Sequence, residues 1–237
     1  MMTSPLFGID ACRGGWLVAH MPSDKRIVHV RVIAHMNAFE RTGASPAHVA
    51  IDIPIGLPDA GRRACDVAAR AALGHPRGTS VFPAPIRESL RATSREDASD
   101  ITRAIDGRGV GAQAWNIVAK VREVDELLQS DPMLRSVLHE VHPELSFMAM
   151  NDGTAVLASK KTPEGIAARR ELLGCAFGRD HFATSRVCIP RRDAADDDIL
   201  DALAALWTAQ RISRATSVAL PDEPELDATG LPMQIVY

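Results

Sequence analysis

The chain has 237 residues and a formal net charge of −3 at pH 7, with 46% hydrophobic and 24% charged residues. This composition is typical of a globular protein and excludes a disordered or fibrous chain, while the small net charge excludes a uniformly basic nucleic-acid coat. The length suits one generous domain or two small ones. Because no repeat or linker divides the sequence, we expect a single domain over residues 1–237.

The charges are distributed unevenly along the chain. Seven arginines stand against two acids between Gly61 and Arg95, whereas nine acids stand against two arginines between Asp193 and Tyr237. This separation could pair a cationic substrate surface with an acidic metal site, or it could form two unrelated solvated faces. Counting alone favours the solvated faces.

The sequence carries no signal for a membrane or for secretion. No apolar stretch approaches the roughly 18 residues of a membrane span, and Asp10 and Arg13 interrupt the N-terminal apolar run that a signal peptide needs. The four cysteines are widely spaced without a C-x-x-C pair, as is typical of reduced thiols. We therefore expect a cytoplasmic protein that does not contact a membrane.

The first part of the chain predicts strands. Apolar runs at Leu6–Asp10, Trp16–Met21 and Ile27–Ile33 are joined by short connections, which favours a three-stranded antiparallel meander. Met36–Arg41 predicts a short helix. His48–Ile55 is a β-branched apolar run interrupted by proline, as is typical of a buried strand.

The middle of the chain predicts helices. Arg62–Leu73, Glu88–Ile105 and Gln113–Leu128 carry apolar residues at helical spacing, and Gly78–Pro85 is expected to be a loop. Residues 60–130 are therefore expected to form a helical insertion after the fourth strand.

Strands and helices alternate in the last part. Arg135–Val141 and Arg186–Ile189 predict strands, whereas Thr162–Leu173 and Asp197–Arg211 predict helices. This order predicts an α/β mixed sheet, antiparallel over its first three strands and parallel later, flanked by helices. The closing run Gln234–Tyr237 could add to a sheet edge or to a second copy, so monomer and homodimer both stay open.

Acidic residues lie where several predicted elements begin or end. Buried carboxylates that converge repel one another and take up protons unless a divalent cation lies among them. Oxygen ligands of this kind suit Mg²⁺ or Mn²⁺. Taken singly, each acid is more typical of a strand end or a helix cap than of a metal ligand. This structural interpretation is weakest for Asp52, because its neighbours in the sequence are apolar. The candidates are Asp10, Asp52, Glu140, Glu144, Asp198 and Asp201.

Six sequence blocks in order resemble one family. They are G-I-D-A-C-R-G-G-W at Gly8–Trp16, A-I-D-I-P-I-G-L-P at Ala50–Pro58, G-R-R-A-C-D at Gly61–Asp66, H-E-V-H-P-E-L-S-F at His139–Phe147, S-K-K-T-P-E-G at Ser159–Gly165, and D-D-D-I-L-D-A-L-A-A at Asp196–Ala205. Together they resemble the bacterial and archaeal family known as domain of unknown function 429, described as predicted nucleases with an RNase H-like fold.

The resemblance implies a five-stranded mixed sheet with acids gathered around divalent metal. It implies a phosphodiester hydrolase that uses Mg²⁺ or Mn²⁺ on a nucleic acid or nucleotide substrate. In two-metal hydrolysis one cation lowers the pKa of the attacking water and the other stabilises the leaving oxygen, and Asp10 would bridge them. The acids that match the family's metal site are Asp10, Asp52, Glu140 or Glu144, and Asp198 or Asp201.

Basic residues are expected to hold the substrate backbone, because the guanidinium fork binds phosphate through two hydrogen bonds. The chain has 23 arginines and 4 lysines, so many of the arginines are incidental. His142 could move a proton, although a structural histidine is the more typical role. The candidates for substrate contact are Arg13, Arg62, Arg63, Arg70, Arg77, Arg87, Lys160 and Lys161.

Two other functions fit the same residues. The D-x-x-x-x-G pattern of Asp10 and Gly15 resembles the first phosphate loop of actin-like and sugar-kinase ATPases, which would make the chain a nucleotide-binding or phosphoryl-transfer protein. The second loop that such proteins need has a weak candidate at Gly107–Gly111. A non-catalytic binding protein that keeps the fold is the third possibility.

Overall fold

A five-stranded mixed sheet forms the centre of the computed structural model, which describes residues 4–22, 27–39, 46–178 and 181–237. The strand order is β3-β2-β1-β4-β5, with β1–β2–β3 antiparallel and β1–β4–β5 parallel. The predicted α/β fold and its mixed sheet are therefore confirmed. The strands are β1 (Leu6–Cys12), β2 (Gly15–Met21), β3 (His29–Ile33), β4 (His48–Ile51) and β5 (Leu138–Glu140).

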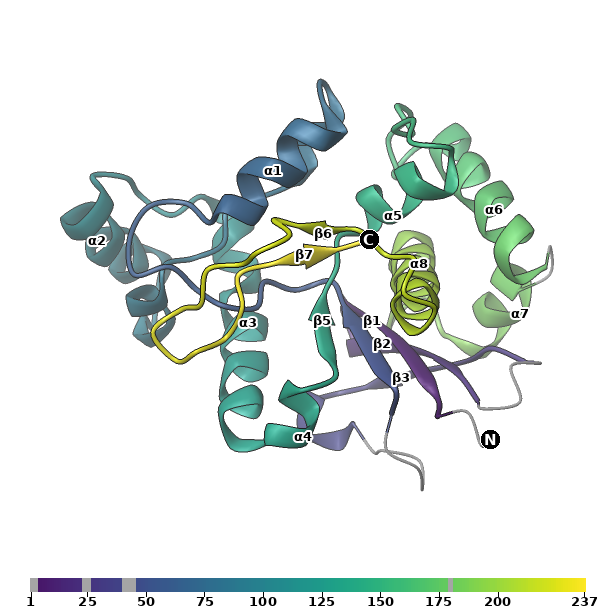
Figure 1. Cartoon of the computed structure of the whole chain (residues 1–237), viewed down its shortest axis with the longest axis horizontal. Helices are drawn as coiled ribbons and strands as arrows, with labels where there is room; N and C mark the ends of the chain where they lie inside the picture. The colour runs from purple at the N-terminus through teal and green to yellow at the C-terminus, as the bar shows by residue number, and fades with distance from the viewer. Residues whose placement is uncertain (1–3, 23–26, 40–45, 179–180) are drawn as a thin grey trace.

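Helices cover both faces of this sheet (Figure 1). The long helix α8 (Asp196–Ser213) packs on one face together with α5 (Pro143–Met150), α6 (Pro163–Phe177) and α7 (His181–Cys188). Helix α3 (Ala112–Ser130) packs on the other face. The remaining elements are η1 (Met36–Ala38), α1 (Ala64–Leu73), η2 (Arg77–Ser80), η3 (Arg87–Arg91), α2 (Arg95–Asp106), α4 (Pro132–Arg135), β6 (Ala219–Leu220) and β7 (Ile235–Val236).

Side-chain alternation along β1 separates the two cores. Leu6 lies in the cluster under α8, whereas Phe7 and Ile9 lie in the cluster under α3. Successive strand side chains point to opposite faces, so Asp10 falls on the α8 face. The first strand therefore carries an acid toward the helix that holds the late acids.

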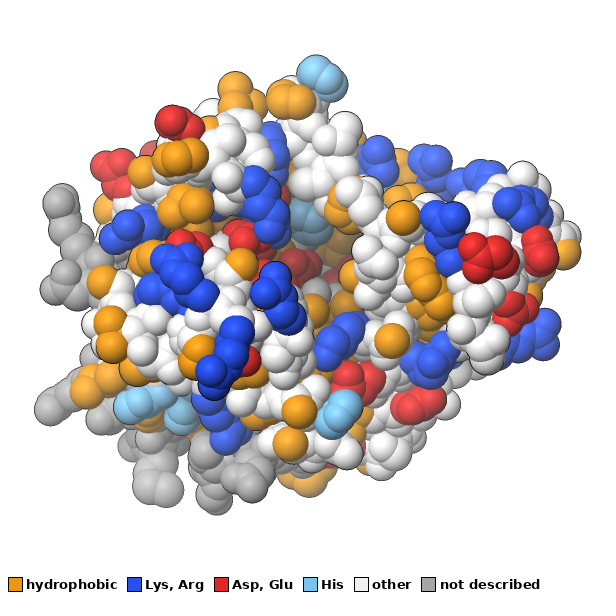
Figure 2. Space-filling model, turned by 180° about the vertical axis from the view of Figure 1, so that it is seen from behind, with side chains coloured by type: hydrophobic (Ala, Val, Ile, Leu, Met, Phe, Trp, Pro, Cys, Tyr) orange, Lys and Arg blue, Asp and Glu red, His pale blue; other side chains and the backbone are white. Residues whose placement is uncertain are grey.

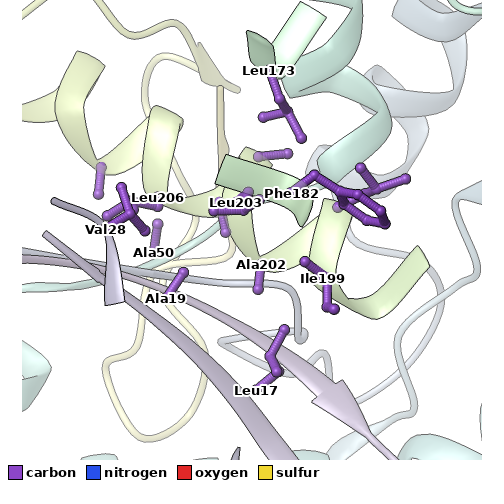
Figure 3. Packing of buried hydrophobic residues seen from close by; sticks show 14 of the residues in the cluster. Leu17, Ala19, Val28, Ala50, Leu173, Phe182, Ile199, Ala202, Leu203 and Leu206 are labelled. Carbon is purple, nitrogen blue, oxygen red and sulfur yellow. The ribbon is translucent and has the colours of Figure 1, made fainter. Parts of the chain in front are cut away.

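Helix α8 lies unusually close to β1. A Cβ atom at Gly8 would stand 2.1 Å from the backbone nitrogen of Leu206 and 2.3 Å from the carbonyl oxygen of Ala202, so only glycine fits. Figure 3 shows small residues of the sheet, among them Ala19 and Ala50, facing this helix. The close approach fixes where the first turns of α8 lie relative to the strand ends.

Two elements of the structure differ from those predicted, one in type and one in extent. Arg186–Ile189, predicted as a strand, lies largely within α7, whose Phe182 and Ser185 are buried one helical turn apart. The single helix predicted for Glu88–Ile105 is two elements, η3 and α2. The break occurs because the Ser94 side chain caps α2 by accepting a hydrogen bond from the Asp97 N–H.

The predicted strand at Arg135–Val141 is shortened from both sides. Arg135 closes α4, and Pro143 begins α5, so the strand keeps only three residues. Glu144 consequently lies in the first turn of a helix rather than beside a strand. Of the short helix predicted at Met36–Arg41, Met36–Ala38 forms η1 and residues 40–41 lie outside the described ranges.

The C-terminal segment pairs within its own chain. Its strand β7 pairs with β6, and Val236 also bridges to Val141 beside β5. Figure 1 shows this hairpin next to β5 and α1. No helix in the described part of the chain is long and apolar enough to cross a lipid bilayer.

Candidate functional site

A cleft of about 750 Å³ opens at the carboxyl ends of the parallel strands β1, β4 and β5. Ligands of open α/β sheets characteristically bind at this edge. Figure 2 shows a hollow with acidic side chains inside and lysine or arginine side chains around it. All six predicted acids line the cleft.

Three of these acids come together from three separate elements. Asp10 lies near the end of β1, Asp52 directly follows β4, and Asp201 lies in the second turn of α8. Asp10 is 7% exposed and Asp201 is 1% exposed. The Asp52 N–H donates to the carbonyl of Ile9 at 2.9 Å, which fixes Asp52 beside the end of β1.

The pKa values of all three carboxylates are raised, and neighbouring charges within the group contribute at Asp10 and Asp52. Burial raises the pKa of Asp10 well above its usual value, and the charges of Asp201 and Asp52 raise it further. Burial, followed by the charge of Asp201, raises the pKa of Asp52 to about 7. Burial likewise raises the pKa of Asp201. The three groups therefore lie near enough to repel one another in a poorly solvated place.

Lys160 opposes this negative charge. Its Nζ forms an ion pair with Asp201 Oδ2, and it lowers the pKa values of both Asp10 and Asp52. The charge of Asp201 raises the pKa of Lys160, so the ammonium form is strongly favoured. The other oxygen of Asp201, Oδ1, is buried without a hydrogen-bond partner in the described structure.

Asp198 has a different role from Asp201, although both lie on the same helix. Its Oδ2 accepts a hydrogen bond from the Ala195 N–H at 2.8 Å, so it caps the start of α8. The side chain is half-buried, and burial raises its pKa. Of the two residues that the sequence left open, Asp201 is the more deeply buried.

Glu140 is held by an arginine. Arg63 Nη1 and Nη2 donate to its two oxygens at 2.6 and 2.7 Å, and the Ile55 N–H donates at 2.6 Å. Arg63 is 2% exposed and also binds Asp66. Burial raises the pKa of Glu140 to about 7 although Arg63 acts in the opposite direction.

Glu144 is held in the same way. Arg169 Nη2 donates to its two oxygens at 2.8 and 2.7 Å, and Arg77 approaches one of them at 2.8 Å. Arg169 is fully buried and also donates to the carbonyl of Gly165. Glu140 and Glu144 are therefore acids of the cleft wall with guanidinium partners, and their lone pairs are largely used.

The three aspartates fit a divalent cation in their chemistry. Carboxylate oxygens are the donors that Mg²⁺ and Mn²⁺ prefer, and the Asp201 Oδ1 atom needs a partner. Among the described residues, however, no three His, Cys, Asp or Glu side chains are already arranged around one point to hold an ion. The carboxylates would have to draw together for binding.

The predicted substrate cations divide into two groups. Lys160, Lys161, Arg63 and Arg77 line the cleft. Lys161 is 70% exposed and pairs with Asp197 at the edge, so its ammonium group can reach solvent. It is the most exposed of the four predicted substrate cations that line the cleft.

The other predicted cations lie elsewhere. Arg70 donates to the carbonyl of Val81 at 2.9 Å, and Arg13 is exposed at the turn after β1. Arg62 is exposed beside a second pocket of about 640 Å³ near the start of α3. Arg87 binds Asp125 through two hydrogen bonds of 3.0 Å.

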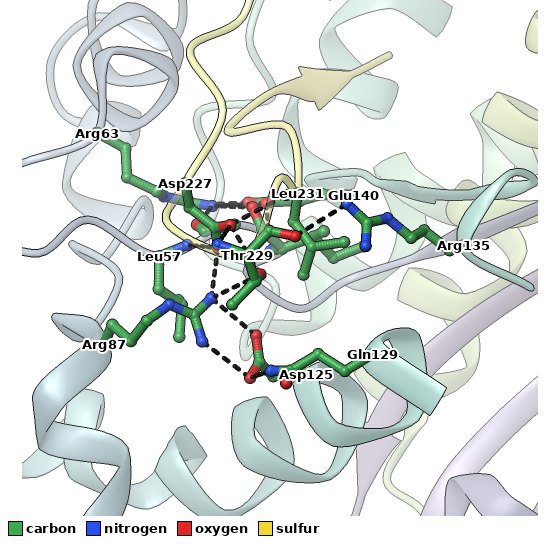
Figure 4. Close-up of polar contacts among 12 residues, drawn as sticks. Leu57, Arg63, Arg87, Asp125, Gln129, Arg135, Glu140, Asp227, Thr229 and Leu231 are labelled. Carbon is green, nitrogen blue, oxygen red and sulfur yellow. Dashed lines mark hydrogen bonds and ion pairs between the residues drawn. The ribbon is translucent and has the colours of Figure 1, made fainter. Parts of the chain in front are cut away.

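Arg87 serves to anchor the C-terminal segment. Besides Asp125 on α3, it pairs with Asp227, whose carboxylate also accepts from the Leu57 N–H at 2.9 Å (Figure 4). These hydrogen bonds lower the pKa of Asp227 against the opposing effect of burial. Through Asp227 the network ties the segment after α8 to the loop that follows β4.

Sequence reasoning missed the role of Arg169. An arginine on a helix normally faces solvent, and no local pattern marks this one as buried. His142 also lines the cleft, and burial lowers its pKa, so its imidazole is neutral at pH 7. Arg169 acts on Glu144, which is 25 residues away in the sequence.

Packing accounts for the glycines of the D-x-x-x-x-G pattern. A Cβ at Gly15, whose φ is +126°, would stand 2.2 Å from the carbonyl oxygen of Ile33. A Cβ at Gly14 would stand 2.9 Å from Val32, and the Gly14 N–H donates to Asp193 at 2.7 Å. These glycines let the β1–β2 turn lie against neighbouring backbone, so they need no phosphate to explain them.

Comparison with known proteins gives a family. A family model described as a protein of unknown function (DUF429) matches residues 8–226, which include every acid of the cleft. Neither the curated proteins nor the solved structures give a match to the chain.

Proposed function

We propose that this chain, which belongs to the DUF429 family, is a divalent-metal-dependent phosphodiester hydrolase. The observation that supports the proposal is the meeting of Asp10, Asp52 and Asp201, three carboxylates with raised pKa values, at the carboxyl edge of the sheet. Burying charges that repel one another destabilises a fold. A cation that binds among the carboxylates would neutralise their repulsion and so offset the free energy that their burial costs.

The chemistry follows from the groups in the cleft. A divalent cation supplies a water of lowered pKa and neutralises phosphate charge. Asp10, Asp52 and the free Oδ1 of Asp201 would hold it. Hydrolysis joins the water oxygen to phosphorus and breaks the bond from phosphorus to one ester oxygen. Neutral His142 lines the cleft and is suited to accept the proton that leaves the water, and its imidazolium form would then return that proton to the departing oxygen.

The substrate would be recognised through its phosphates. Lys161 is exposed at the cleft edge, and Arg77 lies in the wall at 14% side-chain exposure. Aromatic residues make up 4% of the chain, which leaves little material for stacking bases. A nucleic acid or nucleotide held in this way would bind with little sequence preference and with strong dependence on salt.

The decisive experiment is a calorimetric titration of Mn²⁺ into the wild type and Asp10→Asn, with cleavage assays on RNA, DNA and branched DNA. We expect Mn²⁺ to bind the wild type and not the variant, and Mn²⁺-dependent cleavage to be lost with binding. Asp100→Asn, which alters an exposed acid on α2, is the matched control and should behave as the wild type.

Other outcomes distinguish the remaining functions. A wild type that binds no Mn²⁺ and cuts none of these polymers is a non-catalytic protein, and the proposal fails. ATP binding that is lost in Asp10→Asn, without cleavage of any polymer, would instead identify a phosphoryl-transfer or nucleotide-binding protein.

A further inference from the structure

We infer that the second pocket, of about 640 Å³, receives one unpaired base of a nucleic-acid strand whose neighbouring phosphate lies in the cleft, an assignment that rests on the proposed function. The pocket lies between the loop after η2, the end of α2 and the start of α3. The substrate is then single-stranded and not a duplex, because a base must leave its partner before it enters a pocket.

The second pocket adjoins the cleft. Phe82 and Gln113 line both, so one ligand can extend from the cleft into the pocket. Among the described residues that line either space, Phe82 carries the only Phe, Tyr or Trp ring, and it is 43% exposed. A base of any identity stacks on such a ring. One ring at this junction therefore agrees with a substrate that is bound with little sequence preference.

The walls of the second pocket suit the faces of a base. Pro83, Pro85, Ile86 and Val110 line it beside Phe82. Its volume falls within the roughly 300–1,000 Å³ of small-molecule sites, which combine apolar walls with a few polar groups. A phosphate would lose its hydration against such walls, whereas the flat faces of a base lose little. The apolar surface therefore favours the base over the phosphate.

The loop that carries Phe82 is held in place before a ligand binds. Pro83 and Pro85 restrict the backbone on either side of Ala84. The Ala84 N–H donates to Asp66 Oδ2 at 3.1 Å, and Asp66 pairs with a buried arginine of the cleft wall. The aromatic ring therefore loses little conformational freedom when a base stacks on it, which favours binding.

The charged groups of the second pocket favour a nucleic-acid backbone at its edge. Asp106 is already used, because its Oδ1 accepts from the Gly61 N–H at 2.8 Å and its Oδ2 from Arg108 Nη2 at 3.0 Å. Arg62 is exposed and has no hydrogen-bond or ion-pair partner in the described part of the chain. It lines the second pocket and not the cleft, so it can bind the phosphate on the far side of the base. A strand has this second phosphate, whereas a mononucleotide has only the first.

The test measures binding of a probe strand that offers one base. The probe is a short single-stranded DNA, with a ribose counterpart, that is abasic except for one 2-aminopurine, whose fluorescence changes when it stacks. Fluorescence titrations in EDTA and in Ca²⁺ give the dissociation constant. We expect the wild type to bind the probe at least about tenfold more tightly than a strand that is abasic throughout. The 2-aminopurine mononucleotide should bind more weakly than the probe, and 2-aminopurine paired within a duplex should show no change in fluorescence.

Two variants separate the contact with the base from the contact with the phosphate. Phe82→Ala should weaken binding of the probe about tenfold and leave binding of the abasic strand unchanged, because only the stacked base is affected. Arg62→Met should weaken binding of both strands. It should also lower the slope of log affinity against log salt concentration by about 0.7, the contribution of one phosphate in a single strand.

The matched controls alter exposed residues elsewhere. Val187→Ala lies on α7, and Arg214→Met lies at the end of α8 opposite to its acids. Both should bind the probe as the wild type does. Circular dichroism confirms that each variant is folded. If Phe82→Ala does not fold, Phe82→Leu keeps an apolar side chain without the ring, and the two strands are still compared on the wild type.

Each result has one meaning. Equal affinity of the wild type for the probe and the abasic strand overturns the inference, as does a folded Phe82 variant with unchanged affinity. A mononucleotide that binds as tightly as the probe, or a duplex whose fluorescence changes as much, overturns the assignment of a single strand. Mn²⁺ binding and cleavage decide the proposed function separately, so it stands if both are observed while the probe does not bind. Binding of the probe through its base, without Mn²⁺ binding or cleavage, overturns the proposed function alone.

Discussion

Two sets of acids line the same cleft and have opposite surroundings. Glu140 and Glu144 each accept two hydrogen bonds from a buried guanidinium, from Arg63 and Arg169 respectively. Asp10 and Asp52 depend for positive charge on Lys160, which is bonded to Asp201. Burial alone therefore does not identify a functional acid. An acid paired with a buried arginine is a structural residue of the cleft wall, whereas an acid without such a pair is a candidate ligand.

The largest expected effect on stability comes from removing the guanidinium that pairs with a buried acid. Arg63→Met leaves Glu140 and Asp66 buried without their partner, and Glu140 must take up a proton. We expect the free energy of unfolding, measured by urea denaturation, to fall by about 3–5 kcal/mol. Arg91→Met, which removes an exposed pair with Glu88, is the control and should cost less than about 1 kcal/mol. A similarly small loss for Arg63→Met would show that the pairing is not structural.

The pH dependence of stability tests the acids that have no arginine partner. The pKa of Asp52 is about 7 in the folded protein and 3.8 as its reference value, so the folded state keeps a proton that the unfolded chain releases. Its contribution to stability is complete below pH 3.8 and is lost as the pH rises through 7. We expect Asp52 alone to account for a loss of about 2.5 kcal/mol in the free energy of unfolding between pH 5 and pH 8 in the presence of EDTA.

Asp52→Asn removes this dependence and is compared over the same pH range. The smaller slope of the variant isolates Asp52 from Glu140, whose pKa is also about 7. Equal slopes for the wild type and the variant would mean that Asp52 is an ordinary solvated acid, which would remove the contrast between the two sets.

The smallest effect is a gain. Asp10→Asn relieves repulsion from Asp201 and Asp52, so the metal-free protein should become more stable by about 1–2 kcal/mol at pH 7. Thermal and urea denaturation in EDTA measure the gain. Asp100→Asn, at an exposed position of α2, should change stability by less than about 0.5 kcal/mol. A loss of stability in Asp10→Asn would indicate that this aspartate has a structural role.

The sequence predicted the sheet well because its strands are patterned locally. Alternation and apolar runs located β1, β2 and β4, and helical spacing located α8. Arg186–Ile189 was assigned wrongly because a short apolar run suits either a strand or a helix, and contacts with α6 and α8 decide the matter here.

The candidate site could be predicted in part. Strand ends brought Asp10 and Asp52 to one edge, and both line the cleft with Asp201. The partners of Glu140 and Glu144 could not be predicted, because Arg63, directly before α1, and Arg169, on α6, are 77 and 25 residues away from them in the sequence. The assignment of any of these acids as a metal ligand stays a prediction.

The close packing of β1 and α8 has a consequence for the behaviour of the whole chain. Asp10 lies on the first strand and Asp201 on the last long helix, far apart in the sequence. The absence of a side chain at Gly8 allows β1 and α8 to pack against each other. An ion held between them would close a loop that includes most of the polypeptide, as a reversible cross-link does. Chelation would then loosen the first strand and the last long helix together, so resistance to proteolysis would report how fully the site is loaded.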